Sequence, residues 1–158
     1  MLPKIPSVKV LEPIEFFSEF INDIKNAKEE ILIYSPFIGF YGKAELTYSQ
    51  VKRELKNAID REVKVKLIVD KKTVEKAKEE LKNLSNMGIE IYARDMHVKA
   101  VVIDKDKVLY LGSLNPLSYW GKDDIMLRVT GGPLVRREIK KALEKIKLPR
   151  EEEKISLE

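Results

Sequence analysis

The sequence predicts a single α/β domain whose mixed β-sheet is flanked by helices on both faces. Helix-like and strand-like segments alternate over the first 94 residues, which favours a sheet with helical crossovers. Three strand-like segments then lie close together, before one last amphipathic segment. Two of the three are the arms of a hairpin, and the first of these is apolar at both parities (Val98 and Val102 against Val101 and Ile103). A strand with two apolar faces belongs in the centre of a sheet.

The N-terminal third of the chain is expected to contain a helix between two strands. Residues 1–12 hold two prolines and no helical period, so we expect a lead-in with a short edge strand. Pro13 opens an amphipathic helix over 13–28. A buried strand over 31–37 ends at Pro36. Residues 39–46, with two glycines and two aromatic residues, are expected to form a loop over one end of the sheet.

The remaining elements follow in a regular order. We expect a helix over 48–61, a strand over 63–70, a helix over 73–86 and a strand over 89–94. Thr73 is the expected N-cap of the third helix, and Gly88 ends it. After a hairpin, a polar loop leads to a strand over 125–132 and a helix over 133–146. The domain is expected to span residues 1–148, followed by a charged tail over 149–158 with no predicted fold.

The composition excludes several classes of protein. The chain contains no cysteine, so disulfides and thiolate metal sites are excluded. No apolar run approaches the ~20 residues that span a bilayer, and the N-terminus lacks the apolar region of a signal peptide. We therefore expect a cytoplasmic protein without membrane contact. Charged residues make up 35% of the chain, mainly Lys and Glu, which is compatible with a thermophilic source. The net charge of +4 permits a polyanionic partner.

The hairpin over residues 97–115 carries the candidate chemistry. His97 is the only histidine, and it shares a strand face with Lys99, as Ser113 does with Asn115. A two-residue turn would place Ser113 and Asn115 on the face away from His97. A three-residue turn over 105–107 would place His97 opposite Asn115 and Lys99 opposite Ser113. We predict this odd turn or an equivalent bulge.

Such a cluster offers an imidazole, an amine, a hydroxyl and an amide, which suit a tetrahedral phosphate. Three of these groups can hold its oxygens while the ring nitrogen attacks phosphorus. One histidine without acidic ligands at a set spacing is a poor Zn²⁺ site. Ser113 as a hydrolase nucleophile is disfavoured because the chain has no GxSxG motif.

HVKAVVID at 97–104, followed by GSLN at 112–115, resembles the HKD motif of the phospholipase D superfamily. That motif reads HxKx4D and, about six residues later, GSxN. Here seven residues separate Asp104 from Gly112, and we expect the odd turn to absorb the extra one. The motif covers about a tenth of the chain, while the order of helices and strands supports the resemblance over nearly all of it. The resemblance implies the α-β-α sandwich of PLD-like domains.

The resemblance also implies roles for the motif residues. His97 would be the nucleophile that forms a phosphohistidine without a metal or cofactor. Lys99 and Asn115 would bind the phosphate, with Ser113 assisting. Asp104 and Gly112 would be structural, Asp104 fixing the turn. An acid in the next strand orients the histidine in many members, and Asp124 occupies that region, with Asp123 as the less favoured choice.

The superfamily uses two motif histidines, one to attack and one to protonate the leaving oxygen, and this chain has one. The resemblance therefore implies a homodimer with both motifs at a two-fold axis. Small single-motif members resemble nucleases of the Nuc type, and the residues after the motif also resemble nuclease-like domains appended to DNA helicases. We expect a metal-independent phosphodiesterase, foremost an endonuclease that cleaves DNA.

Basic and aromatic side chains could contact DNA, although the basic ones also suit ordinary exposed helix faces and two aromatic ones, Tyr119 and Trp120, also suit dimer packing. The basic candidates are Lys52, Arg53, Lys56, Arg128, Arg136, Arg137, Lys140 and Lys141, and the aromatic candidates are Tyr41, Tyr119 and Trp120. Two alternatives stay open. One is a phospholipid hydrolase or transferase of the same superfamily. The other is a nucleic-acid-binding PLD-like module of a larger helicase, with weak or no activity.

Overall fold

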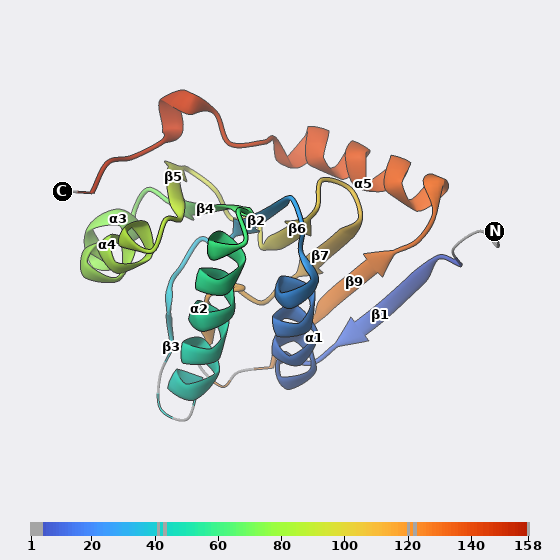
Figure 1. Ribbon diagram of the computed structural model, residues 1–158, viewed down its shortest axis with the longest axis horizontal. Helices are drawn as coiled ribbons and strands as arrows, with labels where there is room; N and C mark the ends of the chain where they lie inside the picture. The colour runs from blue at the N-terminus through green and yellow to red at the C-terminus, as the bar shows by residue number, and fades with distance from the viewer. Residues whose placement is uncertain (1–4, 41, 43, 120, 122, 158) are drawn as a thin grey trace.

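A seven-stranded mixed sheet forms the centre of the protein in a computed structural model (Figure 1). The structure describes residues 5–40, 42, 44–119, 121 and 123–157. The order of the strands across the sheet is β1-β9-β7-β6-β2-β4-β5. Their bounds are Ser7–Leu11 (β1), Glu30–Tyr34 (β2), Lys64–Asp70 (β4), Glu90–Arg94 (β5), Ala100–Ile103 (β6), Val108–Gly112 (β7) and Met126–Thr130 (β9).

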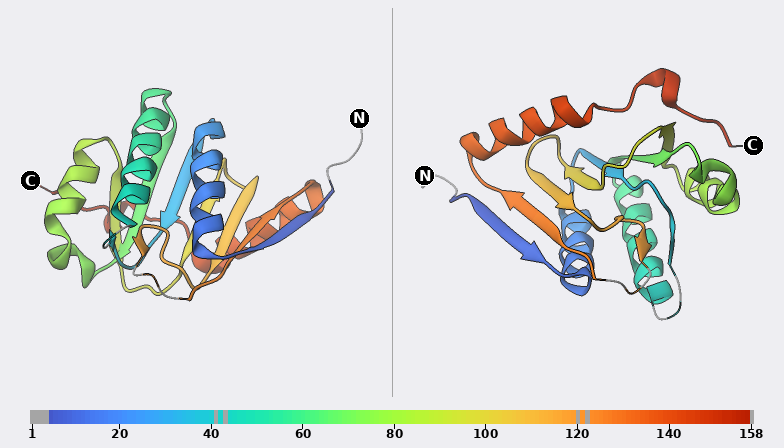
Figure 2. Two further views of the ribbon diagram at one scale, coloured as in Figure 1. Left: turned by 90° about the horizontal axis from the view of Figure 1, so that it is seen from below. Right: turned by 180° about the vertical axis from the view of Figure 1, so that it is seen from behind.

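Helices cover both faces of this sheet, which confirms the predicted fold class (Figure 2). On one face lie α1 (Pro13–Asn26), α2 (Ala44–Asp60), α3 (Thr73–Lys76) and α4 (Lys78–Asn86). On the other face lies α5 (Pro133–Ile146), which runs across the sheet and leaves part of it uncovered. The predicted first and last helices begin at the expected residues, because proline at the first helical position is preorganised for the helical backbone.

Strand β6 occupies the middle of the sheet, as its two apolar faces predicted. Val101 and Ile103 pack into the core beneath α1 and α2. Ala100 and Val102 pack into a second core beneath α5. The predicted edge strand in the N-terminal lead-in is β1, which pairs antiparallel with β9.

Four local expectations are wrong. Helix α2 begins at Ala44, four residues before the expected start at Tyr48. The helix expected over 73–86 is interrupted at Ala77. Thr73 is not an N-cap, because its buried hydroxyl donates a hydrogen bond to the carbonyl of Pro36 at 2.6 Å. The expected loop also contains β3 (Gly39–Phe40), which pairs in parallel with β8 (Ser118–Tyr119).

The predicted three-residue turn of the hairpin is wrong as well. Ala100 pairs with Leu111 and Ile103 pairs with Val108, which is the register of a two-residue turn. Asp104 and Lys105 adopt positive φ angles of 52° and 70°. Such angles are tolerated best by glycine, asparagine and aspartate. The buried carboxylate of Asp104 accepts hydrogen bonds from the amides of Lys28 and Glu29 in the α1–β2 loop and of Glu30 at the start of β2, and these contacts hold the turn in this form.

The C-terminal residues fold against β5, so the expectation of an unfolded tail is wrong. After a short 3₁₀ helix at Glu151–Glu153, Lys154 forms an antiparallel bridge with Tyr92. The amide of Ile155 donates to the carbonyl of Ile91 at 2.9 Å. Ile155 and Leu157 pack against the main core. These two apolar residues follow a run of charged residues at 150–154, which is why composition alone did not reveal their contacts.

Candidate phosphate-binding site

Five of the six motif residues lie at or near the end of the sheet where β2 finishes and β6 begins: His97, Lys99, Gly112, Ser113 and Asn115. Asp104 follows the last residue of β6 and lies at the opposite end. Tyr34, the last residue of β2, pairs with Ala100, the first residue of β6. The two strands are antiparallel, so residues 97–99 run alongside the chain that follows Tyr34. His97 is exposed and Lys99 is half-buried. Both precede the regular strand, so strict strand alternation does not govern where their side chains point.

Asn115 reaches across this end of the sheet. Its side-chain oxygen accepts a hydrogen bond from the amide of Phe37 at 3.3 Å. Phe37 follows β2 and Asn115 follows β7, and these strands lie on opposite sides of β6. The contact therefore spans the start of β6, which carries His97 and Lys99. A bond between the hydroxyl of Ser35 and the amide of Leu117 at 3.1 Å holds the same two loops together.

Ser113 makes its described contacts with the start of β9. Its hydroxyl donates to the carboxylate of Asp124 at 2.8 Å and accepts from the amide of Ile125 at 3.0 Å. In the observed register Lys99 lies opposite Gly112 rather than Ser113, with the amide of Gly112 donating to the carbonyl of Lys99. The expected pairing of Lys99 with Ser113 is therefore absent. Among the described residues Asp124 contacts Ser113, and no contact joins it to His97.

Asp104 and Gly112 have contacts that hold the backbone near the motif in place. The carboxylate of Asp104 is buried and accepts from the amides of Lys28, Glu29 and Glu30 at 3.1, 2.7 and 3.2 Å. It links the hairpin turn to the start of β2. A Cβ atom at Gly112 would lie 2.1 Å from the carbonyl oxygen of Ile125. Only glycine lets β7 and β9 approach this closely beside Ser113.

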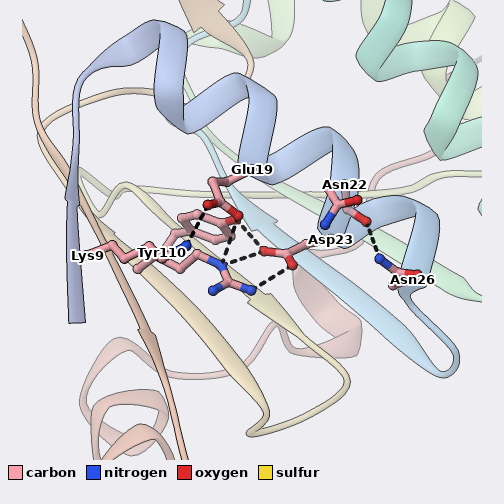
Figure 3. A network of polar contacts seen from close by, with 7 residues as sticks. Lys9, Glu19, Asn22, Asp23, Asn26 and Tyr110 are labelled. Carbon is pink, nitrogen blue, oxygen red and sulfur yellow. Dashed lines mark hydrogen bonds and ion pairs between the residues drawn. The ribbon is translucent and has the colours of Figure 1, made fainter. Parts of the chain in front are cut away.

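Arg128, expected among the DNA-contacting residues, instead belongs to a polar network between α1 and the sheet (Figure 3). Its guanidinium donates two hydrogen bonds of 2.8 Å to the buried carboxylate of Asp23. The hydroxyl of Tyr110 donates to the same carboxylate. Lys9 and Glu19 extend the network to the surface through an ion pair of 2.8 Å. Arg128 is therefore committed to an internal partner.

The network perturbs the titration of its members. Hydrogen bonding to Asp23 raises the pKa of the Arg128 guanidinium, and burial raises the pKa of the Tyr110 hydroxyl. The hydrogen bond from Lys9 lowers the pKa of Glu19. Sequence reasoning missed Asp23, although an aspartate on the apolar side of an amphipathic helix is a usable signal, since a buried carboxylate requires a partner.

The other basic candidates fall into two groups. Some pair with acids: Arg136 and Lys140 contact the buried carboxylate of Asp106 at 2.7 and 3.5 Å, Lys52 contacts Glu80, Lys56 contacts Asp60, and Lys141 contacts Glu138. Arg53 and Arg137 are exposed, without a described ion pair among the residues that the structure covers. Tyr119 is half-buried against Phe17. Tyr41 and Trp120 lie outside the described residues.

A cavity of about 720 Å³ lies beside His97. Its walls come from the end of β5, from the residues leading into β6 and from the C-terminal segment that follows α5. Sequence reasoning did not connect this C-terminal segment with the site. Within the described ranges no cluster of three or more His, Asp or Glu side chains could hold a metal ion. No helix in that part of the chain is both long and apolar enough to cross a bilayer.

The chain belongs to the family of PLD-like domains, because the family described as "Cardiolipin synthase, PLD-like domain" matches residues 20–146. The predicted membership of the phospholipase D superfamily is confirmed. No curated protein sequence matches the chain.

Solved structures share the fold. Nuc from Salmonella typhimurium, a phospholipase D family member, has a TM-score of 0.66 at 17% identity, covering 96% of this chain and 97% of that protein. Phosphatidylserine synthase from Haemophilus influenzae Rd KW20 has a TM-score of 0.66 at 13% identity, covering 91% of this chain and 39% of that protein. TrmBL2, an archaeal chromatin protein described with a novel mode of DNA binding, has a TM-score of 0.55 at 16% identity, covering 87% of this chain and 52% of that protein.

Proposed function

We propose that the protein is a metal-independent phosphodiesterase that cleaves DNA internally, with His97 as the nucleophile in a site shared by two copies of the chain. One observation carries the proposal. The motif residues other than Asp104 lie on segments that meet at one end of the sheet, where Asn115, in the loop after β7, bonds to Phe37, in the loop after β2, across the start of β6.

The proposed reaction has two steps. In the first, a ring nitrogen of His97 attacks phosphorus, a phosphorus–nitrogen bond forms and the bond to one ester oxygen breaks. His97 of the partner subunit gives its proton to that leaving oxygen. In the second step the same histidine takes a proton from water, whose oxygen attacks phosphorus and displaces the first histidine. Lys99 and Asn115 hold the non-bridging oxygens and stabilise their negative charge in both steps.

Within this proposal Ser113 and Asp124 act as one unit. The hydroxyl of Ser113 receives the amide of Ile125 and donates to Asp124, which fixes its orientation at the end of β7. Asp124 is proposed to act on the site through Ser113, and its contact in the structure supports this role over direct orientation of His97. Asp104 and Gly112 hold the backbone that carries these groups.

Two features support a shared site. The chain contains one histidine, and the reaction needs both an attacking base and a proton donor.

An apolar strip also lies next to the site on the face of the sheet that α5 leaves partly uncovered. Val10, Leu127 and Leu111 are neighbours across β1, β9 and β7, with 65%, 38% and 39% of each residue exposed. Leu111 and Ile125 continue the strip to Gly112 and Asp124. Exposed apolar surface of this kind suits a second copy of the chain.

The preference for DNA rests on charge and on the related folds. The chain is basic, with a net charge of +4, and TrmBL2 is a DNA-binding protein with a PLD-like fold. The lipid alternative has its own support, because phosphatidylserine synthase shares the fold at a similar TM-score. The helicase-module alternative would keep binding without vigorous cleavage.

Incubation with single-stranded and double-stranded DNA in excess EDTA tests the proposal. We expect cleavage that His97→Ala abolishes, because the nucleophile is lost while the exposed position tolerates the change. Lys28→Ala, at the opposite end of the sheet, is the matched control and should cleave as the wild type does. Binding without cleavage at every pH would favour the helicase module. Release of choline or phosphatidate from vesicles, with DNA intact, would favour the lipid enzyme.

A further inference from the structure

We infer that the C-terminal segment, residues 147–154, completes the substrate site by supplying part of a cationic rim that binds phosphate groups next to the one that reacts at His97. The cationic rim consists of Lys71, Lys147 and Arg150. The inference rests on the proposed function, because it assumes that the substrate is a nucleic-acid strand with several phosphates.

The rim and His97 share one cavity. Lys71, His97, Lys147 and Arg150 all line the cavity of about 720 Å³, although they come from three distant parts of the sequence. A single phosphodiester group occupies only a small part of such a volume. The cavity therefore has room for a length of strand beyond the reacting group.

The C-terminal segment is held firmly in place. Lys147 ends α5 with a positive φ of 73°, and its carbonyl accepts from the hydroxyl of Tyr34 at 3.1 Å and from Arg94 at 3.0 Å. Burial raises the pKa of Tyr34 to about 12, so the hydroxyl remains a donor at neutral pH. Arg94 also pairs with Glu153 at 3.1 Å. Farther along, Lys154 pairs with Glu90 and bridges to Tyr92.

The charges of the rim are available to a ligand. Lys71 and Lys147 are exposed, and within the described residues neither has an anionic side-chain partner. Arg150 is 66% exposed and its ion pairs with Glu152 and Glu153 are both 3.5 Å long. The pair with Glu152 is exposed on both sides, and an exposed ion pair of this kind is weak, so a phosphate can compete with Glu152 for the guanidinium.

Acids also line the cavity, and they do not cancel the rim. Glu153 is occupied by Arg94 and by the amide of Arg150 at 2.9 Å. Asp95 and Glu152 remain against the three cations of the rim. The balance beside His97 is therefore positive, which favours an anionic strand.

The test compares two substrates that differ in neighbouring phosphates. Bis(p-nitrophenyl) phosphate has one phosphodiester and no neighbour, whereas a single-stranded oligonucleotide has many. For Lys71→Ala/Lys147→Ala/Arg150→Ala we expect KM for the oligonucleotide to rise roughly tenfold, with a loss of less than about twofold on the small substrate. The dependence of log KM on log salt should become shallower by about 2, since each phosphate contact on single strands contributes about 0.7.

The matched control is Lys25→Ala/Lys28→Ala/Lys64→Ala, which removes the same charge at the opposite end of the sheet and should behave as the wild type. Equal losses on both substrates, or equal effects in the control, would overturn the inference. If the wild type cleaves neither substrate, the proposed function fails. Fluorescence anisotropy of a labelled oligonucleotide still tests the rim in that case, because the rim variant alone should bind roughly tenfold more weakly.

Discussion

At the scale of single residues, buried charge determines which side chains are free to act. Arg128 is a basic residue of the kind that contacts DNA, but its guanidinium donates two hydrogen bonds to Asp23. Asp106 likewise holds Arg136 and Lys140 near the start of α5. The sequence alone does not distinguish a cation that is paired with a buried acid from one that is free to bind a ligand. Lys71 and Lys147, which no motif singles out, keep their charge exposed beside His97.

Removal of the Asp23 carboxylate tests how strongly the network holds α1 to the sheet. Asp23→Ala leaves Arg128 and the Tyr110 hydroxyl without their partner, so we expect the free energy of unfolding to fall by about 3 kcal/mol. Urea denaturation measures this change. Asp60→Ala is the matched control, because Asp60 is exposed and its pair with Lys56 should contribute less than about 1 kcal/mol. Equal losses in the two variants would contradict a structural role for the network.

At the scale of elements, the positions of the motif residues depend on where the strands of the hairpin end. The two-residue register of β6 and β7 puts Lys99 opposite Gly112, and a regular continuation of both strands would carry Ser113 and Asn115 away from His97. The regular strands instead stop at this end of the sheet, and the loop after Gly112 brings Asn115 to Phe37. Convergence therefore depends on the loops beyond the strand ends.

The C-terminal segment should detach in acid. Burial acts to raise the pKa of Glu153, but the amide of Arg150 and the charges of Arg94 and Arg150 lower it overall. A carboxylate with a lowered pKa in the folded state stabilises the fold above its ordinary pKa, and this stability is lost as pH falls through the lowered value. We therefore expect the segment to release as pH falls below the ordinary glutamate pKa of about 4.3 and through the lowered pKa of Glu153.

NMR provides the measurement, because the amide of Ile155 bonds to Ile91 and reports docking of the segment. As pH falls through the lowered pKa of Glu153, the shift of this amide should move toward that of an unfolded chain before the amides of β6 change. Glu153→Gln should show a released segment already at neutral pH. Glu144→Gln, on the exposed surface of α5, serves as the comparison and should leave the Ile155 amide in place. An Ile155 amide that titrates together with the sheet would exclude separate release.

For the whole molecule, the uncovered part of the sheet and the single histidine both favour the proposed homodimer. Helix α5 crosses one face without covering β1 and the first half of β9, which contains Leu127 (Figure 1). The apolar strip that remains ends beside Ser113 and Asp124. The proposed reaction requires a second copy that supplies its own His97, and this strip is the surface that we propose for that copy.

Leu127→Lys tests this arrangement. A charge in the centre of the apolar strip should convert a dimer into a monomer and abolish DNA cleavage, since desolvation of lysine in an interface is costly. Analytical ultracentrifugation and the EDTA assay measure the two effects. Ile14→Lys, on the outer surface of α1 and 81% exposed, should leave both mass and activity as in the wild type. A monomeric variant with full activity would refute the shared site.

Local patterns in the sequence were enough to predict the fold class, the central position of β6, the start of α5 and the residues of the motif. These features rest on local patterns: apolar periodicity, proline at a helix start, and residue types at short spacing. Long-range contacts fix the register of the hairpin, where amides between the end of α1 and the start of β2 hold Asp104. Only the tertiary structure shows the pairing of Arg128 with Asp23 and the docking of the C-terminal segment beside His97. Each of these depends on contacts between residues far apart in the chain, to which local periodicity and composition do not respond.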